Sequence, residues 1–232
     1  MLVHGIYPER PKFSLIKPIY KSGDKCSPAN YRPVFSKIFK KVIIKRLFDH
    51  LNSNVILNKH QYGFRSKVST ENASYILLNE ILTALNNKHM VGGIFCDLLK
   101  ALDGINHAVL LEKMQFYGVS GKFYKLVKSY LDGRYQKVIL SHNNIIESTW
   151  EKIKQGVPQG SILGSIFFLI YINDLPNLAS IGTKILLYAD DTSIIVTSPN
   201  LGNFETKIDK IFGDISNWFK VNQLILNYNK TH

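Results

Sequence analysis

Apolar residues recur every three or four positions in several stretches of the chain, which is the spacing of one face of an amphipathic helix. In the segment 36–52 this face includes Ile43, Leu47 and Leu51. The same pattern predicts further helices over residues 69–86, 106–117, 122–131 and 203–222. Ser69 is a suitable N-cap for the first of these. The continuously apolar stretch 161–172 predicts a buried helix.

Short apolar runs bounded by turn-forming residues predict β-strands between these helices. The runs cover residues 13–20, 91–97, 134–140, 145–154, 184–188, 193–197 and 224–228. Two of them flank the tight turn Ala189-Asp190-Asp191-Thr192, which predicts a hairpin. Because hairpins are interleaved with helices, the pattern favours an antiparallel sheet backed by helices, the α+β class, over a doubly wound parallel sheet.

The charge of the chain narrows the choice of partners. Its 29 lysines and arginines against 17 acidic residues give a formal net charge of +12 over 232 residues. Such an excess attracts polyanions and predicts salt-sensitive binding of nucleic acid. Charge alone leaves open the alternative of a basic globular protein without such a partner.

Cysteine content and hydropathy argue against several other classes of protein. Cys26 and Cys96 are the two cysteines, so neither a disulfide framework nor a zinc site is expected. Residues 1–10 do not resemble a signal peptide. The most apolar stretch, 162–172, is shorter than the roughly 20 residues that span a bilayer. We therefore expect an intracellular protein of the cytoplasm or nucleus that is neither secreted nor bound to a membrane.

Three aspartates are the candidate catalytic residues. Asp97 ends an apolar strand, and Asp190 and Asp191 occupy the turn of the apolar hairpin. Adjacent like charges beside apolar strands are unfavourable unless a cation offsets them. Oxygen ligands of this kind suit Mg²⁺ or Mn²⁺, and three carboxylates at one sheet edge could hold two ions about 4 Å apart for phosphoryl transfer. An isolated Asp-Asp pair is more often a structural turn pair than a metal site.

The segments around these aspartates resemble reverse transcriptases of retrotransposons without long terminal repeats, and among these the insect-type, Jockey-like elements. The segments are Tyr188-Ala189-Asp190-Asp191, Phe95-Cys96-Asp97-Leu98-Leu99-Lys100-Ala101-Leu102-Asp103, Gly156-Val157-Pro158-Gln159-Gly160-Ser161-Ile162-Leu163-Gly164, Asn30-Tyr31-Arg32-Pro33, Gln61-Tyr62-Gly63-Phe64-Arg65, Leu169-Ile170-Tyr171-Ile172-Asn173-Asp174-Leu175-Pro176 and Trp218-Phe219. The resemblance covers nearly the whole chain in the order of the family. It implies a right-hand polymerase fold of fingers and palm, with an antiparallel palm sheet backed by helices.

The resemblance also implies roles for individual residues and names the partners. Asp97, Asp190 and Asp191 would bind two Mg²⁺ ions, with Mn²⁺ as an alternative, and the carbonyl of Leu98 could add a ligand. Lys230 would be the acid for the pyrophosphate leaving group. Contacts with the incoming deoxynucleoside triphosphate are implied for Lys21, Arg32, Leu102, Gln159, Gly160 and Tyr188. The macromolecular partners would be an RNA template and a DNA primer, while the oligomeric state stays open.

The family pattern further implies a division into incomplete fingers over residues 1–88 and a palm over residues 89–232. The palm would include part of the fingers insertion, and the thumb and endonuclease would lie outside the chain.

Four features of the sequence depart from the family pattern. Residues are missing between Pro33 and Val34, Leu102 stands where an aromatic ring would exclude a ribose, Leu99 replaces a small polar residue and Ser165 replaces a proline. These departures support an alternative: a degenerate, inactive retrotransposon fragment that at most binds nucleic acid. A metal-dependent phosphohydrolase would account neither for the Pro-Gln-Gly segment nor for the basic charge.

Overall fold

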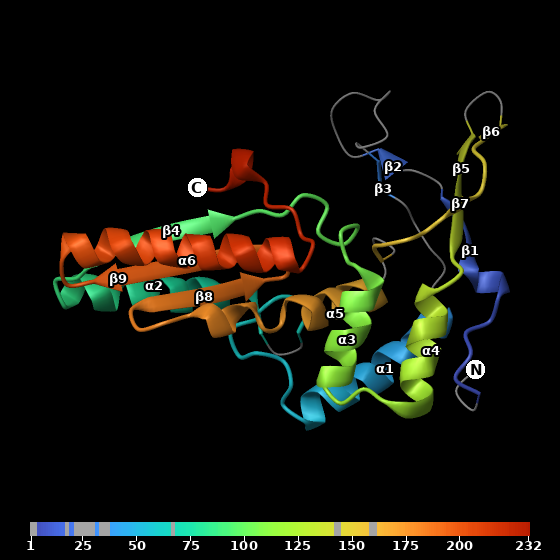
Figure 1. Ribbon diagram of the computed structural model, residues 1–232, viewed down its shortest axis with the longest axis horizontal. Helices are drawn as coiled ribbons and strands as arrows, with labels where there is room; N and C mark the ends of the chain where they lie inside the picture. Colours follow the sequence, from blue (N-terminus) through green and yellow to red (C-terminus); the bar gives the residue numbers. More distant parts are fainter. Residues whose placement is uncertain are drawn as a thin grey trace. The chain divides into compact units, whose positions relative to one another are not determined.

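A computed structural model describes residues 4–16, 19–20, 31–32, 38–65, 68–141, 145–157 and 162–232 (Figure 1). The chain divides into two compact units, each made of two separate stretches. Unit 1 comprises Met1–Asp49 and Ile105–Phe167, and unit 2 comprises His50–Gly104 and Phe168–His232. These units do not follow the expected boundary at residue 88, and the assignment of residues 1–88 to fingers and 89–232 to a palm stays a prediction.

Unit 1 contains two small sheets and two helices that lie wholly within it. Its elements are η1 (Arg10–Lys12), β1 (Phe13–Ile16), β2 (Ile19–Tyr20), β3 (Tyr31–Arg32), α3 (His107–Phe116), α4 (Gly121–Leu131), β5 (Tyr135–Ser141), β6 (Ile145–Glu147) and β7 (Glu151–Lys152). Strand β5 pairs in parallel with β1 and antiparallel with β6 and β7, while β2 and β3 form a separate antiparallel pair. The single strands expected over 13–20 and 145–154 are therefore each divided in two, because β1 and β2 have different partners and β6 and β7 pair with different parts of β5.

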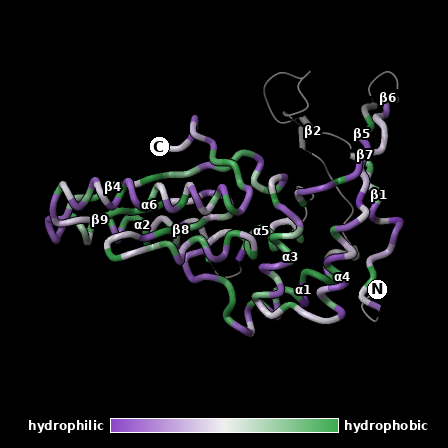
Figure 2. Tube along the Cα trace, viewed as in Figure 1, coloured by the Kyte–Doolittle hydropathy of each residue, from purple (hydrophilic) through white to green (hydrophobic). Residues whose placement is uncertain are grey.

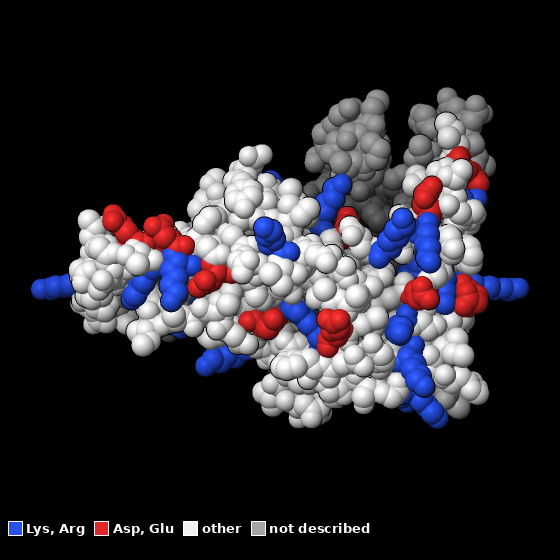
Figure 3. Space-filling model, viewed as in Figure 1, with Lys and Arg blue, Asp and Glu red and all other residues white. Residues whose placement is uncertain are grey.

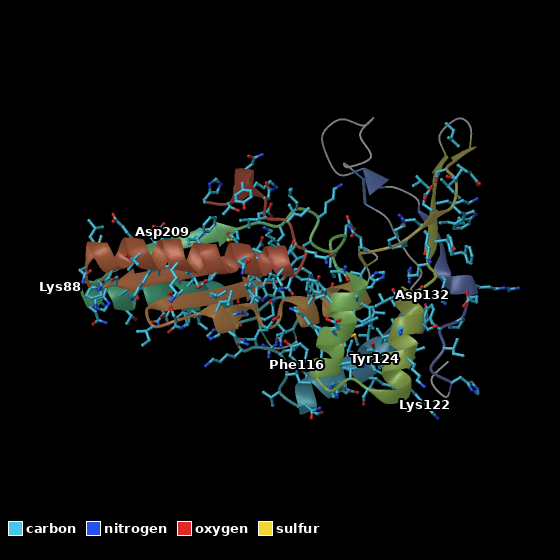
Figure 4. The ribbon with its side chains drawn as sticks, in the orientation of Figure 1. Lys88, Phe116, Lys122, Tyr124, Asp132 and Asp209 are labelled. Carbon is cyan, nitrogen blue, oxygen red and sulfur yellow. The ribbon has the colours of Figure 1, made fainter. Side chains whose placement is uncertain are left out.

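The core of unit 1 lies around α3 and α4. The side chain of Asn106 caps α3 by accepting hydrogen bonds from the N–H groups of Ala108 and Val109. Buried Tyr7 packs edge-on against buried Tyr130 of α4, with ring centroids 4.9 Å apart. Such pairs stabilise a core beyond the apolar area that they bury. Figure 4 labels three exposed or half-buried positions on α3 and α4, namely Phe116, Lys122 and Tyr124.

Unit 2 is built on a three-stranded antiparallel sheet. Its elements are α2 (Thr70–Asn86), β4 (Met90–Cys96), η3 (Leu175–Leu178), β8 (Thr183–Tyr188), β9 (Asp191–Ser198), α6 (Leu201–Val221) and η4 (Tyr228–Lys230). The strand order is β4-β9-β8, so that β9 is central. Helices α1 (Ile38–Ser53) and α5 (Ile162–Ile172) each cross the division between the units. The sheet has the antiparallel arrangement that the hairpin pattern predicts.

Helices α2 and α6 lie on opposite faces of this sheet (Figure 1). From α2, Ile76, Leu77 and Ile81 pack against a buried cluster that includes Leu186 and Ile195. On the other face, α6 approaches so closely that a Cβ on Gly92 would lie 2.7 Å from the ring of Phe204. Hydrophobic and hydrophilic residues alternate along α6 as an amphipathic helix requires (Figure 2).

The C-terminal segment corrects one prediction. Residues 224–228 do not form the expected strand but make a single antiparallel bridge between Leu98 and Leu226. The Leu99 N–H donates to the Ile225 carbonyl, and the Asn227 N–H donates to the Asp97 carbonyl. η4, which begins at Tyr228, interrupts this pairing, and beyond it Phe95 and His232 exchange backbone hydrogen bonds of 2.7 and 3.1 Å. Among the described helices, none combines the length and the apolar character needed to cross a membrane.

Candidate active site

The end of β4 and the turn between β8 and β9 bring the three candidate aspartates, Asp97, Asp190 and Asp191, to one edge of the sheet. Cys96, the last residue of β4, pairs with Thr192, and Asp191 pairs with Tyr188 at the end of β8. One step beyond the pair of Cys96 and Thr192, the antiparallel register sets Asp97 beside Asp191. Asp190 is in the turn itself. Figure 4 labels Lys88, which precedes β4 and so marks the opposite end of the sheet.

The electrostatic interaction of Asp191 with the other two aspartates agrees with this register. Burial raises the pKa of the Asp191 carboxyl above its ordinary value, and the charges of Asp190 and Asp97 raise it further. Desolvation and neighbouring like charges both disfavour a carboxylate. The site therefore concentrates negative charge that the protein itself only partly offsets.

Two residues of the C-terminal segment compensate the charge of Asp97. The side-chain amide of Asn227 donates to Oδ2 of Asp97 at 2.8 Å. Lys230 Nζ lies 3.8 Å from the same oxygen, but its side chain is 72% exposed, so this ion pair contributes little to stability. Lys230 was predicted from the sequence, whereas Asn227 was not, because an asparagine in a loop gives no local sign of a partner 130 residues away.

The donor set fits a divalent cation such as Mg²⁺, which prefers carboxylate and carbonyl oxygens. With the side chains as they stand in the described part of the chain, no three His, Cys, Asp or Glu residues are grouped closely enough to hold an ion. The backbone bonds of the bridge at Leu98 use the Asp97 carbonyl and the Leu99 N–H, and so do not involve the Leu98 carbonyl. The assignment of Asp97, Leu98, Asp190 and Asp191 as metal ligands stays a prediction.

An open pocket of about 210 Å³ lies next to the hairpin turn. Its walls come from the first turns of α2, including Thr70 and Ser74, and from Tyr188, Asp191 and Ser193. Tyr188 is partly exposed, and Leu102 is half-buried in the turn that follows Asp97. Both residues lie in unit 2, as do Asp97, Asp190 and Asp191.

The remaining predicted nucleotide contacts lie outside what the structure describes. Lys21, Gln159 and Gly160 are not among the described residues, and Arg32 is described only as part of the backbone of β3. Their contact with a nucleotide stays a prediction. Just before the Pro-Gln-Gly segment, the carbonyl of Gly156 is hydrogen-bonded to Nε2 of His107 at 2.7 Å, which the sequence analysis did not foresee.

The fold is one that solved telomerase structures share. The structure superposes on the apo telomerase of Candida tropicalis truncated of its C-terminal domain with a TM-score of 0.67 and 17% identity, covering 98% of this chain and 51% of that one. A Candida albicans telomerase in complex with a fragment of telomeric RNA gives a TM-score of 0.61 and 13% identity, covering 97% and 43% of the two chains.

Sequence comparison gives the family. The family model for reverse transcriptase (RNA-dependent DNA polymerase) matches residues 19–232, and the chain belongs to this family. The chain is 31% identical to a probable RNA-directed DNA polymerase from the X-element transposon of Drosophila melanogaster, over 83% of this chain and 22% of that protein. It is 29% identical to the polymerase from the mobile element jockey of the same species, over 85% and 22%. The chain thus spans about a quarter or less of these curated relatives, and the expected resemblance to insect Jockey-like elements is confirmed.

Proposed function

We propose that unit 2 carries the catalytic centre of an RNA-templated DNA polymerase that extends a DNA primer with deoxynucleoside triphosphates. The observation that carries the proposal is the register of β4 and β9, which sets Asp97 beside Asp191 at the hairpin turn. Family membership supports the reaction class. The Drosophila relatives are RNA-directed DNA polymerases by name, which supports the choice of template.

Asp97, Asp190 and Asp191 are the residues that would hold two Mg²⁺ ions. Bound there, the ions would neutralise the charge that builds up on the phosphate oxygens during transfer. The chain's own contribution is to keep three carboxylates at one sheet edge. Asn227 orients one of them through Oδ2 of Asp97. Lys230 reaches the same carboxylate and is a candidate proton donor to the pyrophosphate.

The nucleotide and nucleic-acid contacts complete the proposal. Lys21, Arg32, Gln159 and Gly160 are proposed to contact the incoming nucleotide, as the family pattern implies. The net charge of +12 supports binding of the template and primer phosphates. Lysine and arginine side chains are spread over the visible face and do not gather in one patch (Figure 3). The site of action would be inside the cell, where a retrotransposon transcript is copied.

A second candidate is an inactive domain that binds nucleic acid through its charge. The observations that favour it are Leu102, Leu99 and Ser165, which stand where the family pattern has other residues. Binding of this kind would weaken by orders of magnitude between about 50 and 200 mM salt and show little sequence preference. Both candidates predict salt-sensitive binding, so catalysis alone separates them.

Primer extension on an RNA template tests the proposal. The purified chain is incubated with a primed RNA, the four deoxynucleoside triphosphates and Mg²⁺. We expect extension that is lost in Asp97→Asn and Asp190→Asn and retained in Asp209→Asn. Asp209 is a matched control because it is an exposed aspartate on α6 (Figure 4). Salt-sensitive binding without extension by the wild-type chain would instead support the inactive domain.

A further inference from the structure

Residues 60–63 hold the aspartate-bearing hairpin from the side of β8 that faces away from β9. The N–H of Tyr62 donates to the carbonyl of Leu187 at 2.8 Å, and the N–H of Leu187 donates to the carbonyl of His60 at 2.9 Å. Gln61 and Leu187 thereby form a parallel bridge just before the turn. This short segment is joined to the last residues of β8 in the same way as a further strand would be.

The side chain of Gln61 continues this attachment to the residue before Asp190. Its Oε1 accepts hydrogen bonds from the N–H groups of Gly63 at 2.7 Å and Ala189 at 3.2 Å. Its Nε2 donates to the carbonyl of Ala189 at 3.4 Å. The Gln61 residue is 0% exposed, so water cannot substitute for these bonds. One buried amide therefore contacts both backbone polar groups of Ala189, although the two residues are 128 positions apart.

The backbone of Ala189 needs an external restraint. Its φ of +57° lies in the left-handed region, which is unfavourable for a residue with a Cβ. Strained backbone of this kind persists only where the surrounding structure determines it. Ala189 is buried and directly precedes the Asp-Asp pair, so its conformation sets the direction in which the chain enters that pair.

Gly63 makes the close approach possible. A Cβ at this position would lie 2.1 Å from the backbone nitrogen and 2.7 Å from the Cα of Ala189. Both distances are far inside van der Waals contact, and backbone atoms cannot move aside as a flexible side chain can. Any residue other than glycine would therefore push the turn away from Gln61.

We propose that Gln61 and Gly63 are positioning residues, which fix the backbone of Ala189 and thereby direct the carboxylates of Asp190 and Asp191. The proposal rests on the proposed function, because it is the metal-binding role of these carboxylates that the restraint would serve. Neither residue is proposed to touch the substrate or a metal ion. Gln61 and Gly63 lie in the segment Gln61-Tyr62-Gly63-Phe64-Arg65, whose sequence resembles the family but does not by itself indicate this role.

Amide hydrogen exchange tests the contact without requiring any activity. In Gln61→Met, the side chain keeps its approximate length but loses all three hydrogen bonds. We expect exchange at Ala189 to become faster while exchange at Ile194, in the middle of β9, is unchanged. Gln61→Glu keeps an acceptor oxygen and should retain protection at Ala189. Equal exchange at Ala189 in the wild-type chain and Gln61→Met would overturn the proposal.

Binding of Mn²⁺ alone, followed by electron paramagnetic resonance, tests the positioning role. We expect Gln61→Met and Gly63→Ala to weaken Mn²⁺ binding by about tenfold or more, as the loss of residues that orient metal ligands does elsewhere. Gly213→Ala is the matched control, since a Cβ there would meet nothing within 4 Å. Faster exchange at Ala189 with unchanged Mn²⁺ affinity would overturn the positioning role.

Variants of the aspartates separate this proposal from the proposed function. If Mn²⁺ binds to the wild-type chain and is lost in Asp190→Asn, the proposed metal site stands and the Gln61 result decides the positioning role. If Mn²⁺ binding is absent from the wild-type chain or is indifferent to Asp190→Asn, the proposed function fails and the positioning role fails with it. Hydrogen exchange still decides whether Gln61 restrains Ala189 in either case. Should Gly63→Ala not fold, Gln61→Met decides alone.

Discussion

Asn227 holds Asp97 by two hydrogen bonds of 2.8 Å, one from its backbone N–H to the Asp97 carbonyl and one from its side-chain amide to Oδ2 of the carboxylate. The two residues are 130 positions apart in the sequence. A residue in the C-terminal segment thus fixes both the backbone and the side chain of a candidate metal ligand. The contact engages Oδ2, one of the two carboxylate oxygens of Asp97.

Removing the side chain of Asn227 should therefore impair the site more than the fold. A hydrogen bond to a charged group contributes about 1.5–3 kcal/mol, which corresponds to roughly tenfold to a hundredfold in a rate or binding constant. We expect Asn227→Ala to raise the Mg²⁺ concentration needed for half-maximal primer extension by a factor in this range. Asn217→Ala, at an exposed position of α6, should have no effect. An unchanged Mg²⁺ requirement in Asn227→Ala would show that Asp97 needs no such support.

Mutual repulsion among the aspartates should be visible in the stability of the metal-free protein. The raised pKa of Asp191 shows that its charged form is disfavoured in the fold. Asp191→Asn should therefore melt at a higher temperature than the wild type in EDTA at pH 7. Mg²⁺ should raise the melting temperature of the wild type and have a smaller effect on Asp191→Asn. Thermal unfolding followed by circular dichroism measures both, and a lower melting temperature for Asp191→Asn in EDTA would contradict the prediction.

His107 should make the fold sensitive to mild acid. Burial lowers the pKa of His107, although the hydrogen bond to the Gly156 carbonyl acts in the opposite direction. As pH falls below about 6.5, the ordinary pKa of histidine, the unfolded chain binds this proton before the folded chain does. The free energy of unfolding must then decrease.

The comparison to make is between the wild type and His107→Gln. Glutamine can still donate a hydrogen bond to Gly156 but does not titrate. We expect the free energy of unfolding, measured with urea at pH 7 and pH 5, to fall less in His107→Gln. A residual dependence should remain because burial also lowers the pKa of His60. Identical losses in the two proteins would mean that His107 is protonated equally easily when folded and unfolded.

Leu102 should weaken the discrimination between deoxyribonucleotides and ribonucleotides. The residue is half-buried in the turn after Asp97, where the family pattern has an aromatic ring that would collide with a 2′-hydroxyl. Leucine preserves the apolar wall but removes the flat ring. We expect Leu102→Phe to increase the ratio of deoxyribonucleotide to ribonucleotide kcat/KM, and about 1.4 kcal/mol of selective binding would appear as about tenfold. Equal ratios would show that another residue forms the gate.

Much of the fold follows from local pattern. The helix over 69–86 is α2, and its N-cap Ser69 forms the reciprocal hydrogen bonds of a capping box with Asn72. Strands β4, β8 and β9 begin and end within two residues of their predicted limits. Apolar spacing and capping residues are sufficient to predict the bounds of these elements. Each element buries one face, and residues adjacent to it in the sequence mark where it begins and ends.

What the sequence could not supply was the choice of distant partners. Nothing in the residues 13–16 indicates that β1 pairs in parallel with β5, and the apolar pattern of residues 224–228 does not show that η4 interrupts their pairing. The same holds for the site. Asp97 and Asp191 were predicted from strand ends, whereas Gln61 and Asn227 act on groups more than 120 residues away. A polar residue in a loop carries no local sign of such a partner.

The proposed role of Asp97, Asp190 and Asp191 is to catalyse RNA-templated addition of deoxynucleotides. Its most direct test is the incorporation of a single nucleotide into a labelled DNA primer annealed to an RNA of defined sequence, with Mg²⁺ and one deoxynucleoside triphosphate at a time. We expect the wild-type chain to add the complementary nucleotide in preference to the other three, and Asp190→Asn to lower this rate by more than about a hundredfold. Incorporation that ignores the template base, or that is equal in Asp190→Asn and the wild type, would contradict it.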